Sequence, residues 1–178
     1  GTAPSRVVVV GGGTVGFNAA QVARALGAHV VVLDIDLEKL RYIDTVSHGT
    51  IDTLMATPGN VTDALGGADV VIGAVLVPGA RAPRVITTAM VRQMREGSIV
   101  IDVSIDQGGS VEGIQPTTHS QPTYLLYGVL HYAVPNMPGI VGYNSSVSLS
   151  NATCPYVLKL AGAGLGKAVR QDDAIAKG

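Results

Sequence analysis

The chain has 178 residues, enough for a domain with a sizeable core, and a formal net charge of −1. That charge gives no electrostatic basis for binding nucleic acid or an anionic membrane. Hydrophobic residues make up 47% and charged residues only 14%, as expected of a sheet covered on both faces, of a domain that packs against a further one, or of both.

The first segment, residues 7–34, reads VVVVGGGTVGFNAAQVARALGAHVVVLD. Apolar runs flank a stretch of helical character that Gly27 ends. The segment therefore predicts, in order, a strand over Val7–Val10, a helix over Val15–Leu26 and a strand over His29–Leu33.

The glycines between the first strand and the helix have the GxGxxG spacing of a dinucleotide-binding loop. Gly11 would permit the tight turn, Gly13 the close approach of a pyrophosphate, and Gly16 the packing of helix on strand. The N–H groups at the helix start, from Thr14 and Val15, would face the phosphates. Asp34, 18 residues after Gly16, suits a ribose-binding acid that repels the 2′-phosphate of NADP, so NAD is the expected cofactor.

Strand-like and helix-like segments continue to alternate along the chain, which predicts a Rossmann-type doubly wound α/β fold, with a mostly parallel sheet and helices on both faces. Ligands in such folds bind at the carboxyl ends of the strands. The further elements expected are helices over Leu37–Val46, Asn60–Leu65 and Thr87–Met94 and strands over Thr50–Leu54, Asp69–Val75, Ser98–Val103 and Gly128–Val134.

Two polar residues directly follow late strands. Asp106, next to Ile105 and before a Gly pair, would lie beside a nicotinamide, but an Asp before glycines is equally typical of a turn. Asn136 could donate to a carbonyl or carboxamide while Met137 packs on a flat ring, although a proline-rich turn is the simpler reading of PNMPG.

Three further residues have two readings each. Val75 and Leu76 follow the fourth strand and would border the cofactor or form a covered core loop. Lys39 would flank the adenosine, although a solvated helix residue is the better interpretation from the residues alone.

The four histidines lack metal-ligand spacing, so no metal site is expected.

The pattern changes near residue 140, which divides the chain into a nucleotide-binding domain over 1–140 and a helical C-terminal segment over 141–178. We expect a helix over Ala152–Leu165, with Pro155 in its first turn, and a frayed tail after Gly166. A first strand so close to Gly1 suggests an excised domain or, alternatively, a free-standing NAD-binding or regulatory module.

Cellular location is predicted from what the sequence lacks. Cys154 is the sole cysteine, which excludes an internal disulfide. The first residues, GTAPSR, are not a signal peptide, and no apolar stretch is long enough for a transmembrane helix. A cytoplasmic location without membrane association is expected.

Several segments together resemble the NAD-binding domain of the alanine dehydrogenase family. They are VVVVGGGTVGFNAA, VVVLDIDLEKLRY, DVVIGAVLVPGARAP, GSIVIDVSIDQGG, PTTH, HYAVPNMPG and NATCPYVLKLA. The resemblance implies reversible, NAD-dependent oxidative deamination of L-alanine to pyruvate and ammonia. A related transhydrogenase component usually lacks an acid at Asp106, so this residue favours alanine dehydrogenase over it; a lysine-pathway dehydrogenase is a further alternative.

The resemblance also implies roles for single residues. Asp106 matches the catalytic aspartate that assists proton transfer, and Asn136 a residue beside the nicotinamide. Asp34 matches the adenosine-ribose acid and Lys39 its basic neighbour, while Val75, Leu76 and Met137 match cofactor contacts. Residues 140–146, IVGYNSS, depart from the family pattern, which affects the expected loop geometry there.

Two consequences concern the whole protein. Family members are homo-oligomers, often hexamers, with the active site between two domains. Their substrate-binding arginine and lysine and catalytic histidine lie in an N-terminal domain to which no segment here corresponds, so this chain is expected to bind NAD but not to turn over alanine alone.

Overall fold

A computed structural model describes residues 1–177. The chain divides into two compact units, Gly1–Pro135 and the residues from Asn136 onward. We describe each unit by itself.

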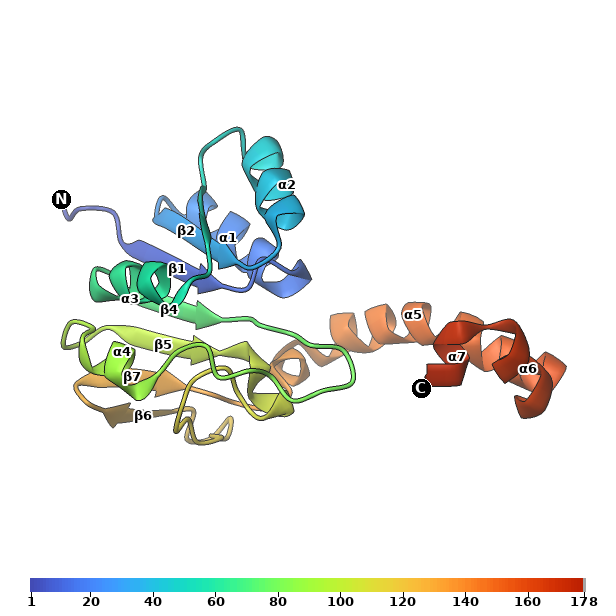
Figure 1. Ribbon diagram of the computed structural model, residues 1–178. Coiled ribbons are helices and arrows are strands. Elements are labelled where there is room, and N and C mark those ends of the chain that lie inside the picture. The colour runs from blue at the N-terminus through green and yellow to red at the C-terminus, as the bar shows by residue number, and fades with distance from the viewer. Residues whose placement is uncertain (178) are drawn as a thin grey trace. The chain divides into compact units, whose positions relative to one another are not determined.

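The first unit is built on a 7-stranded sheet with the order β3-β2-β1-β4-β5-β7-β6. All neighbours pair in parallel except β6, which pairs antiparallel with β7. The arrowheads of β1, β4 and β5 point to one edge in Figure 1, the carboxyl edge. The strands are β1 (Arg6–Val10), β2 (His29–Asp34), β3 (Asp52–Met55), β4 (Val70–Gly73), β5 (Ile99–Asp102), β6 (Thr123–Leu126) and β7 (Val129–Tyr132).

Helices alternate with the parallel strands, which confirms the doubly wound, mostly parallel fold expected from the sequence. Thr57 and Thr87 cap α3 and α4 with their side chains, and Asp36 caps α2, because each oxygen accepts an early N–H of its helix. Gly13 begins α1 without any side-chain cap. The helices are α1 (Thr14–Ala25), α2 (Leu37–Ser47), α3 (Pro58–Gly66) and α4 (Thr88–Arg92), followed after β5 by the 3₁₀ helix η1 (Val103–Gln107).

The core forms two layers because successive side chains of a strand point to opposite faces. Val8 and Val10 of β1 pack in a cluster with residues of α3 and α4. Val7 and Val9 pack in a second cluster with Ala20 of α1 and Ile43 of α2. Helices therefore cover both faces around β1, which explains its unbroken valine run.

One strand was not expected. β6 is an edge strand whose hairpin to β7 turns through Tyr127, at φ 56°, and Gly128, at φ 75°. A tyrosine rarely adopts positive φ, so the turn carried no recognisable signal. β4 also ends at Gly73, two residues before the expected Val75.

The second unit is helical, with η2 (Met137–Val141), α5 (Gly142–Ala163), α6 (Leu165–Gln171) and α7 (Asp173–Lys177). The expectation that a helix begins at Ala152 was wrong. α5 begins ten residues earlier and contains Pro155 in its interior. The remaining backbone hydrogen bonds of this 22-residue helix compensate for the single N–H donor that the proline removes.

The expected frayed tail was also wrong. Asp172 separates α6 from α7, and one of its oxygens accepts the N–H groups of Ala174 and Ile175 at the start of α7. The other oxygen pairs with Lys159 of α5. This ion pair lowers the pKa of Asp172 and raises that of Lys159, mainly through the hydrogen bond between them.

Among the helices of residues 1–177, none is long and apolar enough to cross a membrane.

Candidate functional site

The glycine loop follows β1 at the carboxyl edge. Gly11 has a φ of 106°, and a Cβ there would lie 2.6 Å from Ala74 O. A Cβ on Gly16 would overlap the carbonyl oxygen of Gly11. The fold itself therefore requires these two glycines. Gly13 differs, because a Cβ there would meet nothing within 4 Å, so its missing side chain leaves room on the open side of the loop.

The start of α1 offers unpaired donors to that open side. The helix has no side-chain cap, and Phe17 N donates to Gly13 O at 2.9 Å. The N–H groups of the preceding residues Thr14, Val15 and Gly16 lie in the first turn, where a helix supplies no acceptor. Such a terminus attracts an anion through its donors and its partial positive charge.

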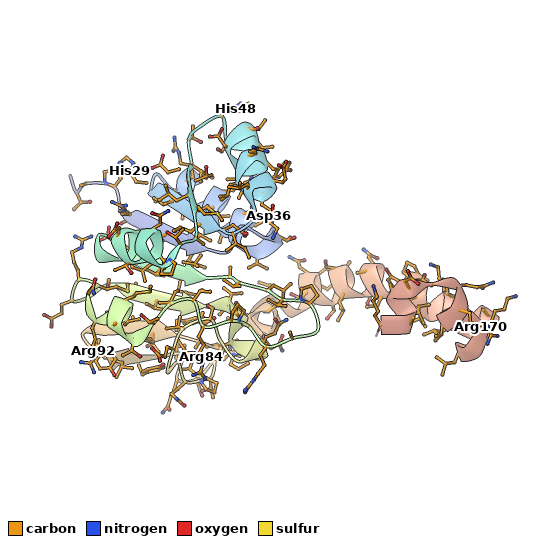
Figure 2. All side chains as sticks on the ribbon, viewed as in Figure 1. His29, Asp36, His48, Arg84, Arg92 and Arg170 are labelled. Atoms are coloured by element: carbon orange, nitrogen blue, oxygen red, sulfur yellow. The ribbon has the colours of Figure 1, made fainter. Side chains whose placement is uncertain are left out.

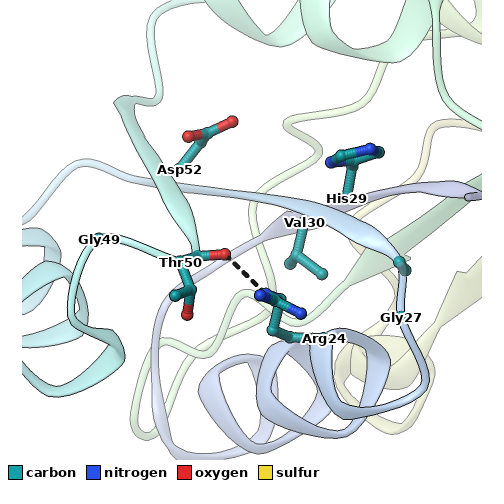
Figure 3. Close-up of a pocket in the computed structure, with 8 residues that line it drawn as sticks. Arg24, Gly27, His29, Val30, Gly49, Thr50 and Asp52 are labelled. Atoms are coloured by element: carbon teal, nitrogen blue, oxygen red, sulfur yellow. Dashed lines mark hydrogen bonds between the residues drawn. The ribbon is translucent and has the colours of Figure 1, made fainter.

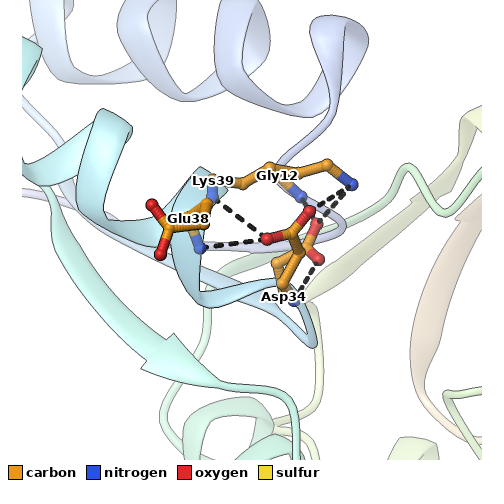
Figure 4. Close-up of polar contacts among 5 residues, drawn as sticks. Gly12, Asp34, Glu38 and Lys39 are labelled. Carbon is orange, nitrogen blue, oxygen red and sulfur yellow. Dashed lines mark hydrogen bonds and ion pairs between the residues drawn. The ribbon is translucent and has the colours of Figure 1, made fainter.

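Asp34 ends β2 and is connected directly to the glycine loop (Figure 4). Its Oδ2 accepts the N–H of Gly12 at 2.6 Å, and its Oδ1 accepts the N–H of Asp36 at 2.9 Å. The residue is 7% exposed. Each carboxylate oxygen can accept a further hydrogen bond, so the side chain is fixed in place yet can still bind a hydroxyl.

Lys39 lies above this carboxylate, on the first turns of α2. Its Nζ is 3.9 Å from Asp34 Oδ2 and 3.8 Å from Asp36 Oδ2, and its side chain is half exposed. The structure thus brings together the whole predicted adenosine and pyrophosphate region, namely Gly11, Gly13, Thr14, Val15, Gly16, Asp34 and Lys39.

The predicted nicotinamide region lies on the loops that follow β4 and β5. Asp106 is exposed on η1 and borders a shallow cavity of about 460 Å³ together with Arg81 and Gln107. Ile105 beside it is buried, and Leu76 is 65% exposed. Ser104 Oγ donates to Val75 O at 2.7 Å, so the two loops are hydrogen-bonded to each other.

Asp102, which sequence analysis did not single out, ends β5 and is 0% exposed. It accepts the N–H groups of Ser104 at 2.9 Å, Ser110 at 2.7 Å and Val111 at 3.0 Å, and the Ser110 hydroxyl at 3.2 Å. Burial raises the pKa of Asp102, and these hydrogen bonds act in the opposite direction. The sequence feature that could have identified Asp102 is an acidic residue within an otherwise apolar strand segment.

Asn136 and Met137 belong to the second unit. Asn136 adopts a left-handed conformation with a φ of 54°, and its carbonyl accepts the N–H of Gly139 at 2.9 Å. Within this unit it borders a cavity of about 780 Å³ with Asn144 and Ser145. The roles of Asn136 and Met137 beside a nicotinamide stay predictions.

A separate hollow of about 290 Å³ lies at the opposite, amino-terminal edge of the sheet (Figure 3). Arg24, His29 and Asp52 line it, and Arg24 Nε donates to Thr50 O at 3.1 Å. None of these residues belongs to the predicted cofactor site.

Within residues 1–177 the histidines do not form a cluster, and His131 packs inside the fold. His29 and His48 are exposed and lie apart (Figure 2). His131 is 2% exposed, stacks on Tyr124 and contacts Val129 O through Nδ1 at 3.0 Å. Burial lowers the pKa of His131. Over the described part of the chain, no three His, Cys, Asp or Glu side chains form a group that could hold a metal ion.

Known proteins resemble this chain over its whole length. The family model described as "Alanine dehydrogenase/PNT, C-terminal domain" matches residues 1–178. An alanine dehydrogenase from Mycolicibacterium smegmatis is 47% identical over 100% of this chain and 48% of its own length. This chain therefore spans about half the length of such curated relatives.

Solved structures show the same likeness. A structure titled L-alanine dehydrogenase has 49% identity and a TM-score of 0.89 over 99% of this chain and 49% of its own. A transhydrogenase from Sinorhizobium meliloti has 28% identity and a TM-score of 0.73 over 83% of this chain and 42% of its own.

Proposed function

Because this chain belongs to the family of alanine dehydrogenase/PNT C-terminal domains, whose cofactor is NAD, we propose that it supplies the NAD-binding half of an L-alanine dehydrogenase. The complete reaction converts L-alanine, water and NAD⁺ into pyruvate, ammonium, NADH and a proton. The other half of the relatives' length would supply the substrate-binding side chains, so this chain alone would bind NAD without turning over alanine.

The observation that carries the proposal is the connection between the glycine loop and Asp34. The N–H of Gly12 donates to Asp34 Oδ2 at 2.6 Å. The open space at Gly13 and the uncapped start of α1 suit a pyrophosphate. Asp34 would then accept hydroxyls of the adenosine ribose, with Lys39 as a basic neighbour. The same carboxylate would repel a 2′-phosphate, so NAD is preferred over NADP.

The chemistry would take place beside Asp106. The nicotinamide would accept the hydride from the alpha carbon of alanine. Asp106, exposed at the cavity next to Arg81, would assist proton transfer during imine formation and hydrolysis. Val75, Leu76 and Ile105 would contact the nicotinamide half of the cofactor, and the family resemblance suggests cofactor contacts for Asn136 and Met137 as well.

The resemblance further suggests features of the complete protein. Residues 1–140 would form the nucleotide-binding domain, and 141–178 would lead back toward the substrate domain. The protein would be a cytoplasmic homo-oligomer, possessing six subunits if it follows the common family pattern, and would act without nucleic acid or membrane.

A second candidate is the NAD-binding component of a transhydrogenase, which the likeness to the Sinorhizobium meliloti structure supports. In that case hydride would pass between two nicotinamide cofactors and no proton-transfer group would be needed. The exposed carboxylate of Asp106 favours the amino-acid dehydrogenase.

The test uses the full-length gene product, with NADH formation in the presence of L-alanine as the readout. Asp106→Asn should lower kcat by about 10²- to 10⁴-fold, the range for loss of a general acid–base group, and should leave NAD affinity nearly unchanged. Asp63→Asn, at an exposed position on α3, is the matched control and should retain wild-type kcat.

Three outcomes would count against the proposal. Activity with another amino acid but not with alanine would refute the substrate. Hydride transfer between NADH and an NADP analogue, without amino-acid oxidation, would establish the transhydrogenase alternative. A large loss of NAD affinity in the Asp106 variant would make this residue structural.

A further inference from the structure

The loop after β5 begins and ends on one buried carboxylate. Asp102 Oδ1 accepts the N–H of Ser104 at 2.9 Å, near the start of the loop. Asp102 Oδ2 accepts those of Ser110 at 2.7 Å and Val111 at 3.0 Å, at its end. Asp106 lies between these two attachment points. A single side chain therefore closes the segment that presents Asp106.

The space around this carboxylate is filled. A Cβ on Gly109 would lie 3.0 Å from Asp102 Oδ2. A Cβ on Gly73 of β4 would overlap Ser110 Oγ and lie 3.6 Å from Asp102 Oδ1. The Asp102 side chain consequently has little room to rotate. As an ionised carboxylate it can only accept hydrogen bonds, and the groups around it are all donors.

The closed loop is also joined to the loop between β4 and α4. Ser110 O accepts the N–H groups of Val85 at 3.0 Å and Ile86 at 3.1 Å, and Gln107 O accepts that of Ala82 at 2.9 Å. Ser104 donates its hydroxyl to Val75 O at 2.7 Å. Asp102 thus holds Ser104 and Ser110, two of the three residues through which this loop binds the other.

We propose that Asp102 is a positioning residue, which closes the 103–111 loop and thereby holds Asp106 at a fixed place beside the loop that carries Val75. The inference rests on the proposed function, in which Asp106 assists proton transfer. Asp102 is 0% exposed, so its side chain would touch neither substrate nor cofactor. Its loss should therefore affect turnover much more than it affects cofactor binding at the glycine loop and Asp34.

The primary variant is Asp102→Asn in the full-length protein. Its amide NH₂ cannot face the two N–H groups at Oδ2, but at Oδ1 it can donate to a reoriented Ser110 hydroxyl. The Ser104 N–H then loses its acceptor. We expect kcat to fall about 10- to 100-fold, the scale of an ångström-sized misplacement, with a much smaller loss of NAD affinity, because the glycine loop and Asp34 keep their contacts. Amide hydrogen exchange should rise over residues 103–111.

Val61→Ala is the matched control for stability, since Val61 is a 2% exposed core residue of α3 outside both loops. At an equal loss of Tm it should keep kcat and leave exchange over 103–111 unchanged. The proposal is overturned if Asp102→Asn leaves either kcat or this exchange unchanged, or if Val61→Ala loses as much kcat.

A second pair of variants applies if Asp102→Asn does not fold. Gly73→Ala should displace Ser110, raise exchange over the loop and lower kcat. Adding Ser110→Ala removes the obstructing Oγ and leaves only ordinary contacts, with Ser110 Cβ and Asp102 Oδ1 each at 3.6 Å, so the double variant should recover both kcat and the exchange rate. Unchanged exchange in Gly73→Ala, or no recovery in the double variant, would overturn the proposal.

The two hypotheses can fail separately. If the wild-type protein does not oxidise alanine, the proposed function is refuted, while hydrogen exchange of the same variants still decides whether Asp102 closes the loop. If the wild type is active but exchange and kcat do not respond, only the positioning role is refuted.

Discussion

Two aspartates at the carboxyl edge of the sheet have much in common, but we propose different roles for them. Asp34 ends β2 and Asp102 ends β5. Both are buried, and both accept backbone N–H groups from a loop that follows a strand. From position alone, either would be a candidate for binding a ligand.

Their hydrogen-bond partners distinguish them. Asp34 accepts two N–H groups, one on each oxygen, and has Lys39 at 3.9 Å. Asp102 accepts four hydrogen bonds, all from residues 104–111. An acid at this edge is therefore assigned to a ligand or to the fold by counting how many of its acceptor sites the protein already uses.

The largest effect is expected from truncating the acid that the fold uses fully. Asp102→Ala leaves three buried N–H groups without an acceptor, which should cost about 3 kcal/mol or more of unfolding free energy. Asp34→Ala removes two such bonds and should cost less, about 2 kcal/mol. Urea unfolding of both variants measures the difference, and equal losses would break the comparison.

Cofactor discrimination should depend on Asp34. Asp34→Asn removes the charge that would repel a 2′-phosphate, so the preference for NAD over NADP should shrink by about 10-fold, the worth of one charged contact. Calorimetric titration with both cofactors measures the ratio of affinities. Asp44→Asn, at an exposed position on α2, should leave the ratio unchanged. An unaltered ratio in Asp34→Asn would remove Asp34 from the cofactor site.

A buried histidine tests whether burial of a titratable group alone produces pH sensitivity. Burial lowers the pKa of His131, so the folded state resists its protonation. The stabilisation is complete above the unfolded-state pKa of about 6.5 and is lost as pH falls through the lower folded-state value. Unfolding free energies at a series of pH values should decline less steeply for His131→Phe than for the wild type. An identical dependence of unfolding free energy on pH in the two proteins would contradict a lowered pKa for His131.

The smallest effect is expected at Lys39. Its half-exposed ammonium is 3.9 Å from Asp34 and 3.8 Å from Asp36, and such pairs contribute roughly 0–1 kcal/mol. Lys39→Met should lower NAD affinity by no more than about fivefold, and by less at high salt. A much larger loss would mean that Lys39 binds the cofactor directly.

The geometry of the candidate cofactor region was predictable because this region lies in one contiguous segment of the chain. Asp34 follows the glycine loop, one helix and one strand, so its distance along the chain from the loop was enough to predict its position. The role of Asp102 was not predictable, because its partners Ser110 and Val111 return from 8 and 9 residues away and Gly73 comes from a different strand.

Fold elements follow the same division. The strands β1, β2 and β5 can be recognised from their continuous apolar runs. The antiparallel pairing of β6 depends on a tyrosine at positive φ, which residue type does not reveal. α5 passes through Pro155 because the rest of its hydrogen-bond ladder outweighs one lost donor.

Calorimetric titration of NAD into the full-length protein and its Asp34→Asn and Asp102→Asn variants tests the central distinction most directly. We predict that Asp34→Asn weakens NAD binding by about 10-fold or more, while Asp102→Asn binds NAD almost as the wild type does. The reverse order of losses, or equal losses in both variants, would contradict the assignment of one acid to the cofactor and the other to the loop.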